Sequence, residues 1–148
     1  MDQSTASSTG LTFHLKKEIE IKAPAAIVWE SILHEVGPGF STPDGVSLRA
    51  KLEPWPGGRW FRDLGNNAGH LWGHVQVIKP PTLLEIVGPM FMSYPAVGWV
   101  QYRVTEKAGV CNLSLTHRVF GEMEPQHREG VQKGWGMMLD RIKARATK

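Results

Sequence analysis

The last third of the chain constrains the fold more than any other part. Residues 110–120 alternate between apolar and polar side chains, a pattern typical of a half-buried strand. An amphipathic helix is predicted directly after it, over about Pro125 to Arg145. The apolar side chains of this helix fall on one face, with the spacing of Val131, Trp135, Met138, Leu139 and Ile142.

Three glycines, Gly130, Gly134 and Gly136, lie inside this predicted helix. Each costs about 1 kcal/mol relative to alanine in a helix interior, so these positions need a structural reason. We expect something to lie close against the helix, either a curved sheet or a ligand held between helix and sheet. The glycines therefore make a cavity beside this helix the central functional question.

The preceding residues predict one further helix and a succession of strands. Residues 13–21 alternate as a strand, and residues 25–36 carry apolar side chains at helical spacing until Gly37-Pro38-Gly39 ends the helix. Further strands are predicted at 46–52, 59–64, 69–79, 83–88, 97–105 and 110–120, with a hairpin at Gly65-Asn66-Asn67.

This order predicts an α+β fold in which a curved antiparallel sheet of about seven strands wraps around the long C-terminal helix. An antiparallel meander has one apolar face, and the two helices must cover it. A sheet curved around a helix closes less tightly than a sandwich and tends to leave a cavity.

Length and composition predict a single domain in a reducing compartment. The 148 residues fit one core, with residues 1–10 as a Ser- and Thr-rich disordered tail and residues 11–148 as the domain. That tail has neither the basic nor the apolar region of a signal peptide. A lone Cys111 rules out an internal disulfide and suits the cytoplasm. No apolar run approaches the 18 or so residues of a membrane span.

Several classes of function are disfavoured by what the sequence lacks. The net charge of +3 is scattered and no nucleic-acid motif accompanies it, so we expect no nucleic-acid partner. No phosphate loop, dinucleotide fingerprint or nucleophile elbow is present, and we expect no cofactor. His70 and His74 would lie about 13 Å apart on a strand, too far to share one metal ion.

Several short motifs, taken in order, point to a known superfamily. The residues that carry the resemblance are Ile19-Glu20-Ile21-Lys22-Ala23-Pro24 before Val28-Trp29, Pro56-Gly57-Gly58-Arg59, Gly73-His74-Val75, Lys79-Pro80-Pro81, Leu113-Ser114-Leu115-Thr116-His117, and Gly134-Trp135 with Leu139. From about residue 11 to 146 the chain resembles the helix-grip superfamily, called SRPBCC or START-like, which includes the birch pollen allergen. Within it the chain is most similar to the branch named for activators of heat-shock protein 90 ATPase.

The resemblance implies the helix-grip fold but no single activity. Such folds include lipid carriers, hormone receptors, polyketide cyclases, oxygenase domains and co-chaperone domains, so a function taken from the fold alone is an analogy. Many relatives have a tryptophan-rich segment after the first helix, where this chain has residues 37–43 instead. This departure implies a different pocket entrance.

Three polar residues are candidates for chemistry inside the cavity. His117 shares a strand phase with Leu113 and Leu115, so it is either a cavity base or a hydrogen-bonded structural histidine. Tyr102 is predicted to point inward as well. Arg62 has two interpretations: it binds a ligand carboxylate if Trp60 faces inward, and it is an ordinary surface charge if Phe61 does.

Aromatic and sulfur-containing side chains are expected to line the cavity. The candidate ligand contacts are Trp60, Arg62, Trp99, Tyr102, Leu115, His117, Trp135 and Met138. Met90, Phe91 and Met92 cluster with Tyr94-Pro95 in a connecting loop that would suit an adaptable gate.

Three hypotheses follow for the function. The first is a cytoplasmic, cofactor-free binding protein for an apolar or aromatic small molecule, monomeric or homodimeric. The second is a cofactor-free enzyme of the cyclase or dehydratase type, in which His117 moves a proton together with Tyr102 or Arg62. The third is a co-chaperone-like interaction module, which predicts an exposed apolar patch.

Overall fold

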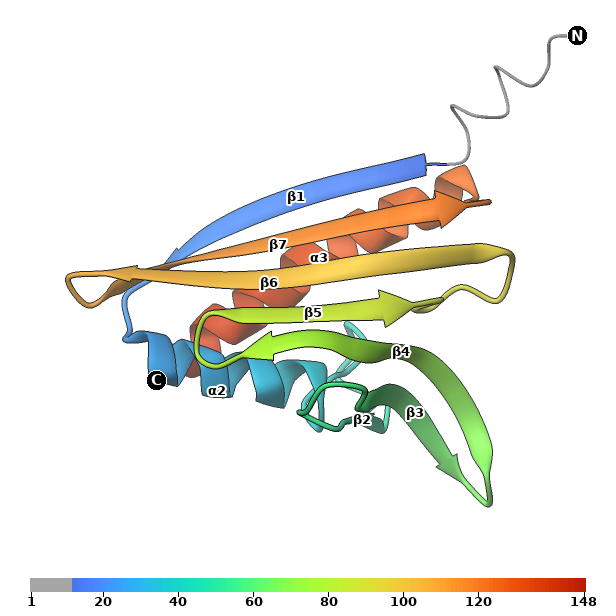
Figure 1. The fold of residues 1–148 in the computed structure, drawn as a ribbon, viewed down its shortest axis with the longest axis horizontal. Helices are drawn as coiled ribbons and strands as arrows, with labels where there is room; N and C mark the ends of the chain where they lie inside the picture. Colours follow the sequence, from blue (N-terminus) through green and yellow to red (C-terminus); the bar gives the residue numbers. More distant parts are fainter. Residues whose placement is uncertain (1–11) are drawn as a thin grey trace, which may run out of the picture.

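A seven-stranded antiparallel sheet and two helices make up the protein in a computed structural model that describes residues 12–148 (Figure 1). The strand order is β1-β7-β6-β5-β4-β3-β2. The elements are β1 (Thr12–Ile21), α2 (Ala25–Val36), β2 (Ala50–Leu52), β3 (Arg59–Gly65), β4 (Ala68–Lys79), β5 (Leu83–Gly88), β6 (Ala96–Lys107), β7 (Val110–Gly121) and α3 (Pro125–Ala146). The predicted α+β helix-grip architecture is thereby confirmed, whereas the expected tail over residues 1–10 lies outside the described residues.

The meander follows from the turns between its strands. At the β3–β4 turn, Asn66 and Asn67 have φ angles of +53° and +61°. Two successive positive φ angles define the type I′ turn, whose twist matches that of a two-stranded hairpin. The hairpin expected at Gly65-Asn66-Asn67 is therefore present.

The strand expected over 46–52 is shorter than its alternating pattern suggested. Only Ala50–Leu52 forms β2, with an isolated bridge between Ser41 and Ser47 before it. Arg49 adopts a φ angle of +53°, which an extended strand does not accommodate. Val46 is 62% exposed, so the alternation in this segment did not reflect a buried face.

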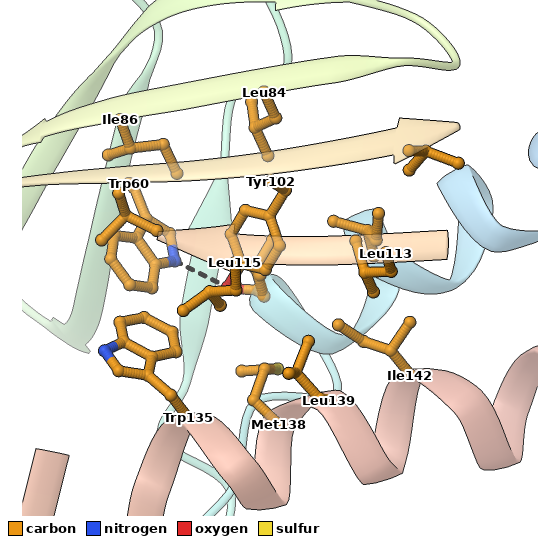
Figure 2. Close-up of a cluster of buried hydrophobic side chains, with 14 of the residues drawn as sticks. Trp60, Leu84, Ile86, Tyr102, Leu113, Leu115, Trp135, Met138, Leu139 and Ile142 are labelled. Carbon is orange, nitrogen blue, oxygen red and sulfur yellow. Dashed lines mark hydrogen bonds between the residues drawn. The ribbon is translucent and has the colours of Figure 1, made fainter. Parts of the chain in front are cut away.

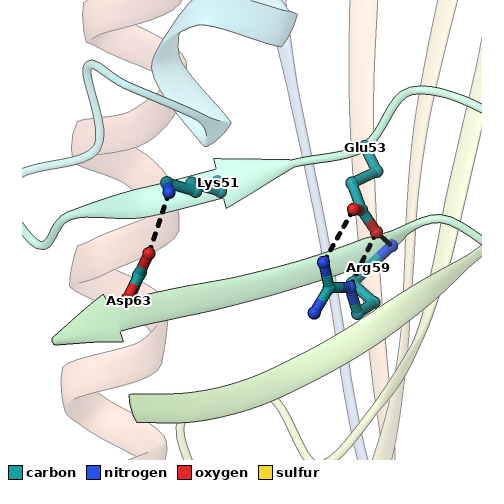
Figure 3. A network of polar contacts seen from close by, with 4 residues as sticks. All are labelled: Lys51, Glu53, Arg59 and Asp63. Carbon is teal, nitrogen blue, oxygen red and sulfur yellow. Dashed lines mark hydrogen bonds and ion pairs between the residues drawn. The ribbon is translucent and has the colours of Figure 1, made fainter. Parts of the chain in front are cut away.

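The core lies between the sheet and α3, where both contribute an apolar face (Figure 2). In α3 the buried stripe contains Val131, Trp135, Met138, Leu139 and Ile142, as the spacing predicted. The facing sheet residues are Leu84, Ile86, Tyr102, Leu113 and Leu115, all fully buried.

Polar contacts fix α2 against α3 and against the sheet. The Ser31 hydroxyl donates to the Ile142 carbonyl at 2.7 Å, and Arg145 forms an ion pair with Glu35 at 2.8 Å. The first amide of α2, on Ala25, donates to a carboxylate oxygen of Glu106 at 2.7 Å. A negative charge at a helix N-terminus is favourable, so the β6 end of the sheet caps α2. Neither helix has the length and apolar character needed to cross a membrane.

Candidate functional site

A pocket of about 150 Å³ opens beside the N-terminal half of α3. Phe40, from the segment between α2 and β2, and Phe91, from the β5–β6 loop, form one side of it. The α3 side is formed by His127, Gly130, Val131, Gly134 and Trp135. The pocket is thus bounded by the rings of Phe40, Phe91 and Trp135, by the side chains of His127 and Val131, and by two glycines of the helix.

The helix glycines leave space open instead of allowing a close neighbour. A Cβ atom added to Gly130 or Gly134 would meet no protein atom within 4 Å. At Gly136 it would meet only the tip of the Lys17 side chain, at 3.9 Å. Of the two alternatives expected for these glycines, close packing of the sheet is therefore wrong. Gly130 and Gly134 are exposed and line the pocket.

A five-ring cluster extends from the wall of the pocket into the core and is formed by Phe40, Trp60, Trp72, Phe91 and Trp135. Phe91 touches the other four rings, with centroid separations of 5.4 to 5.8 Å. The Trp60 indole is fixed by donating to the Val36 carbonyl at 2.8 Å (Figure 2). Edge contacts between aromatic rings of this kind contribute beyond burial of apolar area alone. The cluster therefore fills the space between β3, β4 and α3, and Phe91 is its central ring.

Trp135 joins this cluster to His117 on β7. The Trp135 Nε1 donates to Nδ1 of His117 at 2.8 Å, and the imidazole is fully buried. Burial lowers the pKa of His117 to about 4, and an electrostatic interaction with nearby His127 adds to this effect. With Nδ1 accepting, the neutral ring carries its proton on Nε2, which is buried without a hydrogen-bond partner. This geometry matches the hydrogen-bonded structural interpretation of His117.

Tyr102 and Arg62 both face the interior but do not line the pocket. The Tyr102 hydroxyl is buried without a partner, and burial raises the pKa of this phenol well above its usual value. Arg62 pairs with Ala50 in β2 and shares a face with Trp60, so the inward interpretation describes its position. Its Nε is also buried without a hydrogen-bond partner. The three polar candidates therefore do not converge on one void.

The remaining predicted contacts separate into two groups. Leu115 and Met138 are core residues near Trp135, and Trp60 lies behind the pocket in the five-ring cluster (Figure 2). Trp99 lies on the opposite face of the sheet, because Val100 and Tyr102 in the same strand point inward. The expectation that Trp99 lines the cavity beside α3 is therefore wrong, because neighbouring residues of a strand point to opposite faces of the sheet.

Two segments that border the pocket are tied to α3 by hydrogen bonds. The Tyr94 hydroxyl pairs with Nδ1 of His127, which connects the β5–β6 loop to the first turn of α3. Arg141 donates to the carbonyls of Ser41 and Thr42, both at 2.9 Å, next to Phe40. Phe40 was missed as a site residue because it lies in a segment without a periodic pattern. His127 was missed although it precedes Val131 by four residues in the predicted helix, a spacing that places both on one face.

The described part of the chain, residues 12–148, contains no group of three or more His, Cys, Asp or Glu side chains placed to hold a metal ion. Cys111 is buried in β7, and burial raises the pKa of its thiol. Among the described residues that line the pocket, His127 and Trp135 carry the polar side-chain atoms.

Comparison with known proteins gives one family match. The model of the family described as Activator of Hsp90 ATPase homolog 1-like protein matches residues 22–147. No curated protein compared with the chain matches it.

Solved structures agree on the fold. CV1439 from Chromobacterium violaceum is 15% identical with a TM-score of 0.69, covering 91% of this chain and 97% of the other. CalU16 from Micromonospora echinospora is 22% identical with a TM-score of 0.61, covering 91% and 75%. DynU16, from the dynemicin biosynthetic locus, is 16% identical with a TM-score of 0.64, covering 88% of this chain and 46% of the other. At these identities the likeness shows the fold alone.

Proposed function

The chain belongs to the family of Activator of Hsp90 ATPase homolog 1-like proteins, and from this premise we propose that it binds an apolar or aromatic small molecule in the α3 pocket. The ligand would lie along Gly130 and Gly134, against the rings of Phe40, Phe91 and Trp135. Apolar clefts with a few polar groups are the usual form of small-molecule sites.

The single observation that carries this proposal is the open space beside the two helix glycines. Each glycine costs about 1 kcal/mol relative to alanine in a helix interior. No protein atom lies where a side chain at Gly130 or Gly134 would begin, so packing does not require glycine there. A ligand that packs against the helix backbone at these two positions would explain why both are glycine.

The size of the pocket suggests the size of the ligand. The volume of about 150 Å³ is half of the roughly 300 Å³ at which drug-sized sites begin. An apolar cavity of about 150 Å³ in another protein accommodates benzene. We therefore propose a single aromatic ring, or an aliphatic group of similar bulk, as the part of the ligand that enters.

The similar structures support a small-molecule function only in a general way. One of them, DynU16, is described as a protein of the dynemicin biosynthetic locus, which is consistent with a role beside a small organic molecule. The alternative of a cyclase or dehydratase has less support in this chain, because His117 and Tyr102 do not border the pocket.

The test uses alanine substitutions that separate binding from folding. Gly134→Ala places a methyl group in the pocket, and Gly136→Ala is the matched control on the same helix, since Gly136 does not line the pocket. Both substitutions should raise the melting temperature by about 2–4 °C, because alanine is the better helix former. Binding of fluorobenzene, followed by ¹⁹F NMR, should weaken at least fivefold in Gly134→Ala and stay within twofold of the wild type in Gly136→Ala.

Two results would contradict the proposal. If fluorobenzene binds Gly134→Ala as well as it binds the wild type, the ligand does not occupy this pocket. If Gly134→Ala lowers the melting temperature, the glycine serves packing and the argument from open space fails.

A further inference from the structure

The sheet carries a second apolar depression, on the face that the helices leave uncovered. It has a volume of about 630 Å³ and lies at one end of β5, β6 and β7. Of the six apolar side chains that border it, Phe13 and Val119 are buried. We call the other four the outer patch: Val87, Val97, Trp99 and Phe120. None of them belongs to the pocket beside α3.

The strand register makes the outer patch continuous. Val97 is directly opposite Phe120, and Trp99 is directly opposite Val87. Farther along the strands that carry the patch and along β1, the outward positions are mostly polar, as in Lys16, Glu18, Glu20, Gln101, Arg103 and Thr116. The apolar character is therefore confined to one end of the face and is not a general property of the sheet.

Two of the four side chains of the outer patch are exposed, and Val87 and Trp99 are half-buried. Phe120 is 66% exposed and Val97 is 47% exposed. Contiguous exposed apolar surface on a protein marks interaction sites, and Trp and Arg are the side chains most enriched where binding energy concentrates. An interaction surface accounts for apolar side chains at positions where strand alternation usually supplies polar ones.

The charges beside the outer patch indicate the character of the partner. Arg118 stands opposite Trp99 in the register and His14 stands opposite Arg118, so both flank the aromatic rings. Arg118 forms no ion pair with any of residues 12–148. Among the described residues that border the depression, none is a carboxylate. A guanidinium without an ion pair among the described residues, beside the exposed ring of Phe120 and the half-buried ring of Trp99, is complementary to a partner that has both carboxylates and large apolar groups.

A second copy of this chain fits the outer patch poorly. A two-fold contact brings the same surface of each copy together. Centred on Trp99, such a contact would place Arg118 of one copy close to Arg118 of the other, with no carboxylate among the described residues that border the depression to compensate. Like charges brought together at an interface are costly.

We propose that the outer patch binds an acidic polypeptide segment that carries large apolar side chains. The apolar side chains of the segment would cover Trp99 and Phe120, and a carboxylate would pair with Arg118. This surface lies on the opposite face of the sheet from the small-molecule pocket, and it corresponds to the interaction-module hypothesis.

The test uses one synthetic peptide and its charge-reversed control. The first is a 16-residue amphipathic helix with Leu and Phe on one face and Glu on the other, and the second replaces every Glu by Lys. Binding of fluorescently labelled peptide to the full chain should be detectable for the Glu peptide, at least tenfold weaker for the Lys peptide, and weaker at higher salt.

Matched variants locate the binding surface. Arg118→Glu and Phe120→Ser should each weaken binding of the Glu peptide at least tenfold. Both side chains are exposed, so we expect both variants to fold. Arg103→Glu makes the same charge change about 13 Å farther along β6 from Trp99, beyond the screening length at physiological salt, and should change binding less than twofold. Gly134→Ala should leave peptide binding unchanged, so failure of the pocket proposal and failure of this one are distinguishable.

Four outcomes would overturn the proposal. Equal weakening by Arg118→Glu and Arg103→Glu would mean that only net charge matters. If the Lys peptide binds as tightly as the Glu peptide, Arg118 does not select acidic partners. A dimer seen by light scattering and lost in Phe120→Ser would identify a second copy as the occupant. Binding of phosphatidylserine vesicles that Phe120→Ser abolishes, without peptide binding, would identify a membrane surface.

Discussion

Trp135 is the side chain that couples the pocket to the sheet. One edge of its indole borders the pocket and contacts Phe91, while its Nε1 donates to His117 on β7. The His117 imidazole leaves little room on its other side: a Cβ added to Gly98 would lie 3.0 Å from Nε2 and 3.1 Å from the Met90 side chain. A shift of Trp135 on ligand binding would therefore be transmitted to β7 through a histidine that has little space to move.

The lowered pKa of His117 predicts a dependence of stability on pH. The folded pKa is about 4 and the ordinary value is 6.5, so between these values the unfolded chain binds a proton that the folded chain does not. The free energy of unfolding is therefore fully retained above pH 6.5 and falls as the pH drops towards 4. The loss attributable to this one group should approach about 3 kcal/mol, at 1.36 kcal/mol per pKa unit. Urea unfolding at a series of pH values measures it.

The variant His117→Gln isolates this contribution. A glutamine amide oxygen accepts a hydrogen bond from Trp135 but does not titrate in this range. We expect the variant to be less stable than the wild type at pH 7.5, and the difference to shrink as the pH falls to 4. A difference that stays constant with pH would show that His117 does not titrate on unfolding as described.

At the scale of elements, α3 is divided into two functional halves. Its N-terminal half carries the pocket glycines and His127, and its C-terminal half carries Arg141 and Arg145, which tie it to other segments. Hydrogen bonds hold both halves, through His127 and Trp135 in the first and through Arg141 and Arg145 in the second, and the glycines leave one side of the first half open. The anchors explain how an open pocket wall keeps its shape.

Most of the elements were predictable because their signals are local. Burial of one face is enough to produce the alternation in residues 13–21 and 110–120 and the helical spacing in residues 25–36. The structure confirms these two strands and this helix. The strand expected from Val46 was too long, since the left-handed backbone at Arg49 depends on how the loop closes onto β3. There the Arg49 carbonyl accepts from the Asp63 amide, a contact that no local pattern predicts.

Loss of the Arg141 anchor should loosen the segment that carries Phe40. The guanidinium bonds two successive carbonyls, Ser41 and Thr42, in a forked geometry that lysine does not reproduce. Arg141→Lys keeps the charge and should speed hydrogen exchange of amides in residues 39–48, including that of Leu48, which is bonded to the Phe40 carbonyl. We expect fluorobenzene binding to weaken about threefold or more, since one such hydrogen bond is worth about 1 kcal/mol.

The control for this variant is Lys143→Arg, a conservative change in the same turn of α3 whose side chain is exposed. It should leave both hydrogen exchange and binding unchanged. Unaltered exchange in residues 39–48 of Arg141→Lys would show that the loop is held by its own backbone contacts instead.

At the scale of the whole molecule, the sheet separates the pocket beside α3 from the outer patch. The residues of these two surfaces were predicted from the sequence with different success. Trp135 was identified from the helical stripe, and its place at the pocket wall depends only on which face of α3 is buried. The pocket as a whole was not predictable, because Phe40, Phe91 and His127 come from three segments that meet only in the folded chain. Trp99 was assigned to the wrong face although Tyr102, in the opposite phase of the same strand, was assigned correctly.

The central place of Phe91 leads to a prediction about ligand size. Its ring contacts the other four rings of the five-ring cluster and borders the pocket, so it limits how far a ligand penetrates towards Trp60 and Trp72. Wild-type protein should bind fluorobenzene more tightly than the two-ring probe 1-fluoronaphthalene, because the larger ring must displace Phe91. Phe91→Leu removes the planar ring but keeps an apolar side chain, and should reverse the order of the two affinities in ¹⁹F NMR titrations. Val97→Ala, on the outer face of the sheet, is the control that should leave the order unchanged. Preference for the larger probe in the wild type would mean that the pocket opens readily without the mutation, and that Phe91 is a mobile gate and not a wall.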